Sequence, residues 1–226
     1  MSILSEIIKE FKFNVGYRKS LMSAQKKLDA KAPRPGNIAP DFTLYDIEGK
    51  ESVTLSDFRG QKPVALVFGS FTWPPYVKGT VGLKEIYKQY HEEVQFINIY
   101  IREAHPTDGW WLGKKWTKKL IEAILTDRAS MEHEDAKTIE ERRATAGECE
   151  SALQYGIKTY VDEMDDRVNH TYAGWPTRLY LIGKDGKIVY AGGQGPLDFK
   201  PAKLQAAIKK YLSQWRKATR TLFAKK

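Results

Sequence analysis

Two short segments carry the residues with the clearest chemical potential, FGSFTWPPYV over residues 68–77 and INIYIREAHPTDGW over residues 97–110. In the first segment, Ser70, Thr72 and Trp73 stand where a strongly apolar strand gives way to a helix. The first turn of a helix favours an anion through its unpaired N–H groups and the helix dipole, and Pro74 needs no N–H there. A thiol at position 73 would have a lowered pKa and would react as its thiolate. The position therefore suits a thiolate or selenolate, toward which Ser70 and Thr72 could donate hydrogen bonds, but it holds a tryptophan.

The second segment places Glu103 and His105 at the C-terminal end of an apolar strand, the edge of an α/β sheet where ligands bind. A histidine beside a carboxylate can transfer a proton at neutral pH. Simpler interpretations stay open on the residues alone. Ser70 and Thr72 are also ordinary cap and turn residues, and a lone histidine after a strand is commonly a surface residue.

The hydrophobic pattern predicts the elements that must position these residues. They are two short strands with a Glu-Gly turn, a strand over 63–68, a helix over 79–91, a strand over 94–101, a mostly helical polar segment over 106–156, a strand over 159–164, a short helix or turn over 168–174, a hairpin over 177–193 and a C-terminal helix. The predicted apolar faces of the two main helices are Val81, Leu83, Ile86, Tyr87 and Tyr90, and Leu204, Ile208, Leu212 and Trp215.

This order of elements is that of an α/β, thioredoxin-like fold with a peroxiredoxin-style N-terminal β-hairpin and a helical insertion at about residues 106–156. The strand, helix, strand order predicts a right-handed parallel crossover. Pro176, in Gly174-Trp175-Pro176-Thr177, directly precedes the hairpin strand. Thioredoxin-like folds resemble one another in carrying a cis-proline at this place, so we expect a cis peptide bond before Pro176.

Composition limits the function classes. Cys149 is the only cysteine, which excludes an intrachain disulfide and a Cys-x-x-Cys centre. The net charge of +9 comes from residues 200–226, which hold nine Lys or Arg and no acid. This basic end is compatible with a peripheral membrane contact, but a solvated helix face explains the charge as simply. An amphipathic N-terminal helix is also predicted and could make the same contact or pack against the body of the protein; its apolar residues are Ile3, Leu4, Ile7, Ile8 and Phe11.

Three regions follow from these patterns: an N-terminal helix and linker over 1–36, a main domain over 37–215 and a basic tail over 216–226. No apolar run reaches about 18 residues and no export signal is evident, so a cytoplasmic protein is expected. No nucleic-acid motif accompanies the basic end. A homodimer is an open alternative.

Two further segments, APDFTLYDIEGKESVTLSDFRGQKP over 39–63 and TRLYLIGKDGKIVYAGGQGP over 177–196, complete a specific resemblance. The first looks like the front end of the redoxin families. Together with the two segments quoted at the outset, they make residues 37–212 resemble the iodothyronine deiodinase family and its bacterial relatives.

The resemblance implies roles for particular residues. Position 73 corresponds to selenocysteine in that family, or to cysteine in some relatives. Tyr100, Glu103 and His105 match members of its catalytic network. Arg178 matches an arginine near the substrate pocket, and the substrate is expected to contact Arg178, Trp175 and Pro176. The chain departs from the pattern at three positions: Trp73, Arg102 where vertebrate members carry glutamate, and Phe71 where some members have a second cysteine.

The activity implied is thiol-dependent reduction: removal of iodine from an aromatic compound such as thyroxine, or reduction of a peroxide. The resemblance implies no bound cofactor or metal, a small halogenated aromatic or a peroxide as substrate, and an external thiol as reductant. The alternative is an inactive binding protein whose pocket, lined by Trp73, Trp175 and Trp110, holds an aromatic ligand or a partner peptide.

Trp73 itself has three interpretations. A selenocysteine codon, UGA, differs by one letter from the tryptophan codon UGG and is read as tryptophan in some genetic codes. Alternatively, the chain is a pseudo-enzyme that kept the pocket and lost its nucleophile. In the third interpretation, Glu103 and His105 serve a different reaction.

Overall fold

The computed structural model describes residues 16, 19–109 and 132–223 of the chain. Its centre is a pair of parallel strands, β3 (Val64–Gly69) and β4 (Gln95–Tyr100), joined by helix α2 (Pro74–Tyr90). The register runs from Val64 opposite Gln95 to Gly69 opposite Tyr100. Every residue of β3 is buried, as expected for a central strand covered on both faces. The parallel crossover expected from the sequence is therefore present.

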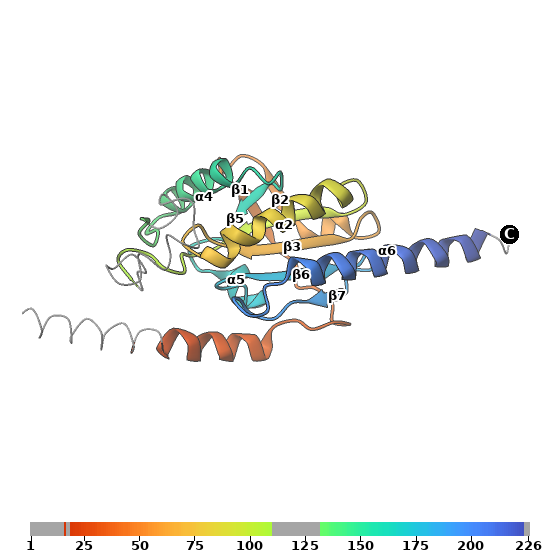
Figure 1. Ribbon diagram of the computed structural model, residues 1–226, viewed down its shortest axis with the longest axis horizontal. Helices are drawn as coiled ribbons and strands as arrows, with labels where there is room; N and C mark the ends of the chain where they lie inside the picture. The colour runs from red at the N-terminus through yellow and green to blue at the C-terminus, as the bar shows by residue number, and fades with distance from the viewer. Residues whose placement is uncertain (1–15, 17–18, 110–131, 224–226) are drawn as a thin grey trace, which may run out of the picture.

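The other strands extend this pair into a mixed sheet of the order β2-β1-β5-β4-β3-β6-β7 (Figure 1). β5 (Thr159–Val161) continues the parallel part beside β4, while β6 (Arg178–Ile182) runs antiparallel to β3. The outer strands pair antiparallel as well: β1 (Thr43–Asp46) with β2 (Ser52–Thr54) and with β5, and β7 (Ile188–Ala191) with β6. A 3-10 turn, η1 (Leu55–Phe58), follows β2.

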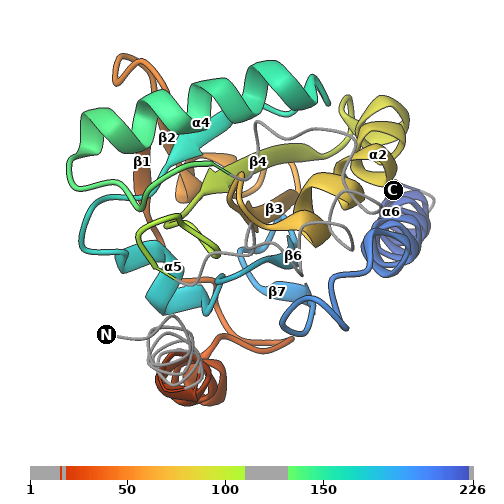
Figure 2. The same cartoon turned by 60° about the vertical axis from the view of Figure 1, so that its left-hand side comes forward.

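Helices cover both faces of the sheet (Figure 2). On one side lie α2, α4 (Ile139–Leu153) and α6 (Pro201–Phe223). The other side carries α5 (Arg167–Tyr172) and the N-terminal helix, residues 19–31. The sheet is thus the middle layer of three, and its central strands are shielded from water on both faces.

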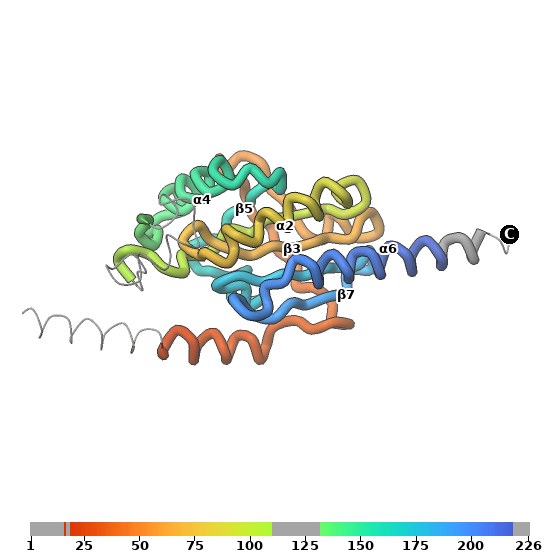
Figure 3. Tube along the Cα trace, in the orientation of Figure 1, coloured from red at the N-terminus to blue at the C-terminus, as the bar shows by residue number. Residues whose placement is uncertain are grey.

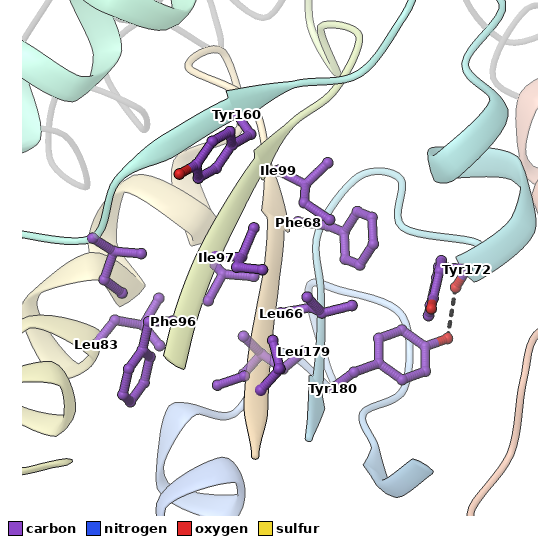
Figure 4. Packing of buried hydrophobic residues seen from close by; sticks show 14 of the residues in the cluster. Leu66, Phe68, Leu83, Phe96, Ile97, Ile99, Tyr160, Tyr172, Leu179 and Tyr180 are labelled. Atoms are coloured by element: carbon purple, nitrogen blue, oxygen red, sulfur yellow. Dashed lines mark hydrogen bonds between the residues drawn. The ribbon is translucent and has the colours of Figure 1, made fainter. Parts of the chain in front are cut away.

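An aromatic cluster fixes α5 against the sheet (Figure 4). The ring of Phe68 on β3 lies 5.6 Å from the ring of Tyr172, which in turn meets Tyr180 of β6 edge to face at 5.2 Å. The Tyr180 hydroxyl donates a 2.6 Å hydrogen bond to the carbonyl of Tyr172, so its polar end is satisfied inside the core.

The structure corrects two helix predictions. α2 begins at Pro74, as the first-turn position of Pro74 had indicated and earlier than the start at residue 79 given by the apolar pattern, and Val81, expected on its apolar side, is 71% exposed. On α6, Leu204, Ile208 and Leu212 are buried as expected, but Trp215 is 41% exposed and stacks on Tyr211. Figure 3 shows that α6 continues beyond the end of the sheet, and Trp215 also has the ammonium of Lys184 over its ring, 4.9 Å from the centroid.

The remaining predictions have mixed outcomes. The peptide bond before Pro176 is cis, as predicted, and a second cis bond precedes Pro196. α6 extends through Phe223, so the region predicted as a tail from residue 216 is helical up to that point. The apolar stripe of residues 3–11 and residues 110–131 of the predicted insertion lie outside the described residues, and α4 is the helix described within the rest of that insertion. Among those described, no helix is long and apolar enough to cross a membrane.

The N-terminal helix is attached to the sheet by a buried ion pair. The fully buried guanidinium of Arg178 donates to the Asp29 carboxylate at 2.7 Å and, through Nε, to the carbonyl of Gly192 at 2.7 Å. Gln25 adds a 3.1 Å hydrogen bond to the carbonyl of Ala173. Residues 25 and 29 thus connect the region predicted as a separate helix and linker to the face that carries α5.

We expect Asp29→Ala to lower the free energy of unfolding by about 1 to 3 kcal/mol, because it leaves the buried Arg178 cation without its carboxylate. Urea denaturation measures the change. Asp198→Ala is the matched control, since its pair with Lys200 is exposed on both sides and should contribute under about 0.5 kcal/mol. Equal effects of the two variants would contradict this account of the ion pair.

Candidate functional site

The candidate site lies at the C-terminal ends of β3 and β4, where α2 begins. Gly69 ends β3, and a Cβ added there would lie 2.2 Å from the ring of Tyr76, so glycine is what allows α2 to pack this closely. Trp73 is the N-cap residue, and its carbonyl accepts hydrogen bonds from the N–H groups of Tyr76 and Val77 at 3.0 and 3.2 Å.

This helix start offers fewer free donors than the sequence led us to expect. Pro74 and Pro75 have no N–H, the N–H of Trp73 donates to the Ser70 carbonyl at 3.2 Å, and that of Tyr76 is already used. An anion at position 73 would therefore be stabilised here by the helix dipole, with less help from backbone hydrogen bonds than an ordinary helix start provides.

A buried carboxylate, Glu103, joins the ends of the two strands. Its Oε2 accepts hydrogen bonds from the backbone N–H and the hydroxyl of Thr72, at 2.9 and 2.6 Å. The same Thr72 oxygen accepts the backbone N–H groups of Ala104 and His105, at 3.1 and 3.0 Å. The hydroxyl of Thr72 thus donates its only proton to Glu103. Its role is to hold the loop of residues 103–105 against the start of α2.

Tyr100 completes this cluster from inside the sheet. Its hydroxyl donates a short hydrogen bond to Oε1 of Glu103 and accepts the backbone N–H of Phe71 at 3.1 Å. Both oxygens of the carboxylate are therefore bonded, one to each strand end. The structure brings together Thr72, Tyr100, Glu103 and the backbone of His105, four of the residues predicted from the sequence.

Burial governs the charge state of the cluster. Loss of solvent raises the pKa of Glu103 above its ordinary value, although the hydrogen bonds from Thr72 and Tyr100 act in the opposite direction. Burial also raises the pKa of Tyr100 well above its ordinary value, and the neighbouring charge of Glu103 adds to this. A carboxyl with a raised pKa, bonded to a phenol, is a group that can hold a proton closer to neutral pH than an exposed glutamate.

Trp73 fills the space beside this cluster. Its indole is 8% exposed and lies over the imidazole of His105, with 5.2 Å between ring centroids and 31° between ring planes. The indole N–H is buried and has no hydrogen-bond partner among the described residues. Ser70 Oγ, three residues earlier in the same turn, is likewise buried and unbonded. One unsatisfied polar group therefore lies at the position that the sequence singles out, and a second lies three residues before it.

The other predicted residues divide into two groups. Trp175 lies close to the cluster, because its indole N–H is 3.4 Å from the carbonyl of Glu103, and Pro176 follows it in the cis conformation. Arg178 is held elsewhere: it shares its sheet face with Phe68 and Tyr180, where Asp29 and Gly192 engage its guanidinium. Contact of Arg178 with a substrate stays a prediction.

Cys149 is poorly suited to act as a nucleophile. It is buried on α4, and burial raises the pKa of its thiol well above the ordinary value, so the reactive thiolate is disfavoured. Trp110, predicted to line the pocket, lies outside the described residues.

Sequence reasoning missed residues that support the site from a distance. Asp135 accepts the backbone N–H of Glu103 at 3.1 Å and pairs with Arg102 at 3.0 Å. Asp162 accepts the N–H groups of Val168 and Asn169 at 3.2 and 2.7 Å and so fixes the start of α5. An aspartate between a strand and a helix was a usable signal for Asp162, whereas nothing local marks Asp135, which lies 32 residues from its partner.

Comparison with solved structures defines the fold class. The chain superposes on the thioredoxin domain of a thiol-disulfide oxidoreductase from Bacteroides vulgatus with a TM-score of 0.50 and 17% identity, covering 80% of this chain and 99% of that one. A secreted disulfide oxidoreductase from Mycobacterium tuberculosis gives 0.51 and 13%, covering 75% and 95%. At these identities the likeness establishes a mixed α/β, thioredoxin-like fold.

The sequence matches the iodothyronine deiodinase family over residues 12–212, and the chain belongs to this family. It is 28% identical over 188 residues to a thyroxine 5-deiodinase from Sparus aurata, covering 82% of this chain and 64% of the relative. The corresponding protein from Gallus gallus is 28% identical over 200 residues, covering 88% and 71%. The chain thus spans somewhat under two thirds of the length of the Sparus aurata protein.

The pKa of Glu103 leads to a pH prediction. Because the folded protein keeps a proton on Glu103 above pH 4.5, where the unfolded chain has released it, the free energy of unfolding should fall as pH rises from 4.5 toward the folded-state pKa. Glu103→Gln removes this titration, so the wild-type protein should lose stability relative to the variant over that range. Urea denaturation at successive pH values measures the difference, and a wild-type advantage that grows with pH would contradict the raised pKa.

Proposed function

We propose that this site is that of a deiodinase-like, thiol-dependent oxidoreductase whose reacting atom is a selenolate or thiolate at position 73. The observation that carries the proposal is the hydrogen-bonded cluster of Thr72, Tyr100 and Glu103 at the ends of two adjacent strands, directly before Trp73, the N-cap residue of α2. A chain with tryptophan at position 73 has this framework without the nucleophile. Indole has no ionisable thiol and does not form the covalent bond to iodine or oxygen that a thiolate or selenolate forms.

The unsatisfied polar groups support the same view. A buried indole N–H ordinarily has a partner, and a buried hydroxyl without one costs about 1 to 3 kcal/mol. Trp73 and Ser70 both lack such partners among the described residues. A small anionic side chain at position 73 would remove the orphaned indole N–H and would offer Ser70 an acceptor in its own turn.

The reaction would proceed in two stages. The chalcogenide at position 73 attacks the iodine of an aryl iodide, the carbon–iodine bond breaks, and the carbon takes a proton from His105 while a chalcogen–iodine bond forms. An external thiol then displaces iodide, and a second thiol attacks the resulting mixed bond, which regenerates the chalcogenide and yields a disulfide. The aryl iodide is reduced and the two thiols are oxidised. With a peroxide, the chalcogenide would attack the distal oxygen instead.

In this scheme the buried residues position the acid. Thr72 holds the backbone of His105, and Glu103 ties Thr72 to Tyr100, so the imidazole stays beside position 73. The halogenated aromatic and the thiol reductant are the two partners that the proposal requires.

We expect a Trp73→Cys or Trp73→selenocysteine variant to gain thiol-dependent iodide release from an iodinated phenol, or thiol-dependent consumption of hydrogen peroxide. Adding His105→Ala should lower the new activity by about 10²-fold or more, since that is the usual contribution of a general acid. Trp73→Ser is the matched control, because it opens the same space without a thiol.

Thermal melting by circular dichroism establishes that each variant is folded. Activity of the cysteine variant no higher than that of the serine control or of the His105→Ala double variant would overturn the proposal. The mass of the alkylated peptide that contains residue 73, taken from the source organism, shows separately whether tryptophan, cysteine or selenocysteine is present there.

A second candidate function is the binding of an aromatic ligand without catalysis. The observation that favours it is the unbonded indole N–H of Trp73, a buried donor that a phenolic oxygen could satisfy, with Trp175 also buried near the cluster.

For this candidate we expect a halogenated phenol to quench tryptophan fluorescence saturably in the wild-type protein. Trp73→Phe, which keeps an aromatic ring and loses the N–H donor, should weaken the binding about 3- to 10-fold, the usual value of one hydrogen bond. Quenching that rises linearly with concentration, or that is identical in the variant, would contradict a site at Trp73.

A further inference from the structure

A cavity lies at the other end of the sheet from the candidate site. It has a volume of about 280 Å³ and is bounded by Val64 at the start of β3 and Ile182 at the end of β6, which pair with each other. The candidate site begins at Gly69, the last residue of β3. At about 3.3 Å per residue, the length of β3 puts roughly 16 Å between the two places.

Three chain segments enclose this cavity and are fixed to one another by backbone hydrogen bonds. They are residues 38–41, the end of η1 with the loop to residue 62, and the β6–β7 turn. The N–H of Ala39 donates to the carbonyl of Gly186 at 2.9 Å, and that of Gly60 donates to the carbonyl of Lys184 at 2.8 Å. The walls are thus held in place, as expected of a largely preformed binding site.

The floor of the cavity is apolar. Ala39, Leu55, Val64 and Ile182 line it and are all buried, and Phe58 adds a half-buried aromatic ring. Because these side chains have no polar atoms, the deep part of the cavity favours an apolar group.

Two cations lie at the edge of this apolar floor. Arg59 is exposed and Lys62 is half-buried, and neither forms an ion pair with any residue that the structure describes. The guanidinium of Arg59 lies directly against Gly186, where φ is +78° and an added Cβ would come within 2.6 Å of Nε. The missing side chain at Gly186 therefore makes room for Arg59 at the edge of the cavity.

Asp41 is the acidic side chain among the lining residues. Its Oδ1 accepts hydrogen bonds from the backbone N–H groups of Phe42 and Ser56, at 3.0 and 2.9 Å. This carboxylate therefore joins residues 41–42 to the start of η1. The lining keeps a net positive charge, and its two cations are available to a ligand.

We propose that this cavity binds a small carboxylate with an apolar tail or ring, its apolar part on Leu55, Val64 and Ile182 and its carboxylate between Arg59 and Lys62. The volume lies near the lower limit for ligand pockets, which favours a molecule of this size over a peptide. The site is independent of position 73, so the proposal does not depend on the function proposed above.

Octanoate is a suitable probe, with octanol and octylamine as uncharged and cationic counterparts of the same length. Titration of the full chain, followed by ¹H–¹³C NMR of methyl groups, should shift Leu55, Val64 and Ile182 saturably, with a dissociation constant of roughly millimolar or below. Octanol and octylamine should bind about 3- to 10-fold more weakly, because they lack the attraction to the two cations.

Variants locate the site. Lys62→Met should weaken octanoate binding about 3- to 10-fold and should leave octanol binding unchanged, since it removes the charge and keeps the apolar stem. Ser56→Trp, on the exposed rim, should block the cavity and abolish binding without disturbing the core. Lys203→Met, an exposed lysine on the first turn of α6, is the matched control and should bind octanoate as the wild type does.

The proposal would be overturned by equal binding of octanoate and octanol, by shifts centred on residues near Trp73, by wild-type affinity in a folded Ser56→Trp variant, or by the absence of any saturable shift. Methyl spectra of the free variants show whether each is folded.

Discussion

The hydrogen bonds between Thr72 and Glu103 are the interaction on which the candidate site depends. They join the segment after β3 to the segment after β4, two places 31 residues apart in the chain. Because Oε1 of the same carboxylate is held by Tyr100, the loop of residues 103–105 has its position set by a side chain inside the sheet. The place of His105 beside residue 73 follows from this arrangement, since its backbone N–H is bonded to the same threonine.

The loss of hydration at Glu103 explains why its pKa is raised. A carboxylate buried this deeply loses its hydration, and three hydrogen bonds compensate only in part, so the pKa of Glu103 stays raised. A proton is therefore easier to keep in this cluster than at the surface. The same burial that holds the cluster together thus moves the pKa of Glu103 upward from that of an exposed glutamate.

Much of the fold and part of the candidate site could be predicted from the sequence. The features that could not be predicted have identifiable physical reasons. Local signals sufficed for the parallel β3-α2-β4 unit and the hairpin, whereas the cis bond before Pro176 was predicted from its place in the order of elements of a thioredoxin-like fold. The apolar pattern alone placed the start of α2 too late, because it begins only after the two prolines that open the helix. Side-chain partners distant in sequence, such as Asp135 with Glu103, leave no local pattern at all.

Arg178 shows how a residue type can be placed correctly on a strand and still have its contacts predicted incompletely. Its alternation along β6 puts it on the face opposite α2, with Phe68 and Tyr180, and Asp29 from the N-terminal helix meets it there. One nitrogen of its guanidinium, Nη2, is buried and unbonded within the part of the chain that the structure describes. A buried cation with a spare donor is stable only while its carboxylate partner stays in place. Asp29 therefore neutralises this buried cation and at the same time joins the N-terminal helix to the face of the sheet opposite α2, although it lies far in sequence from β6.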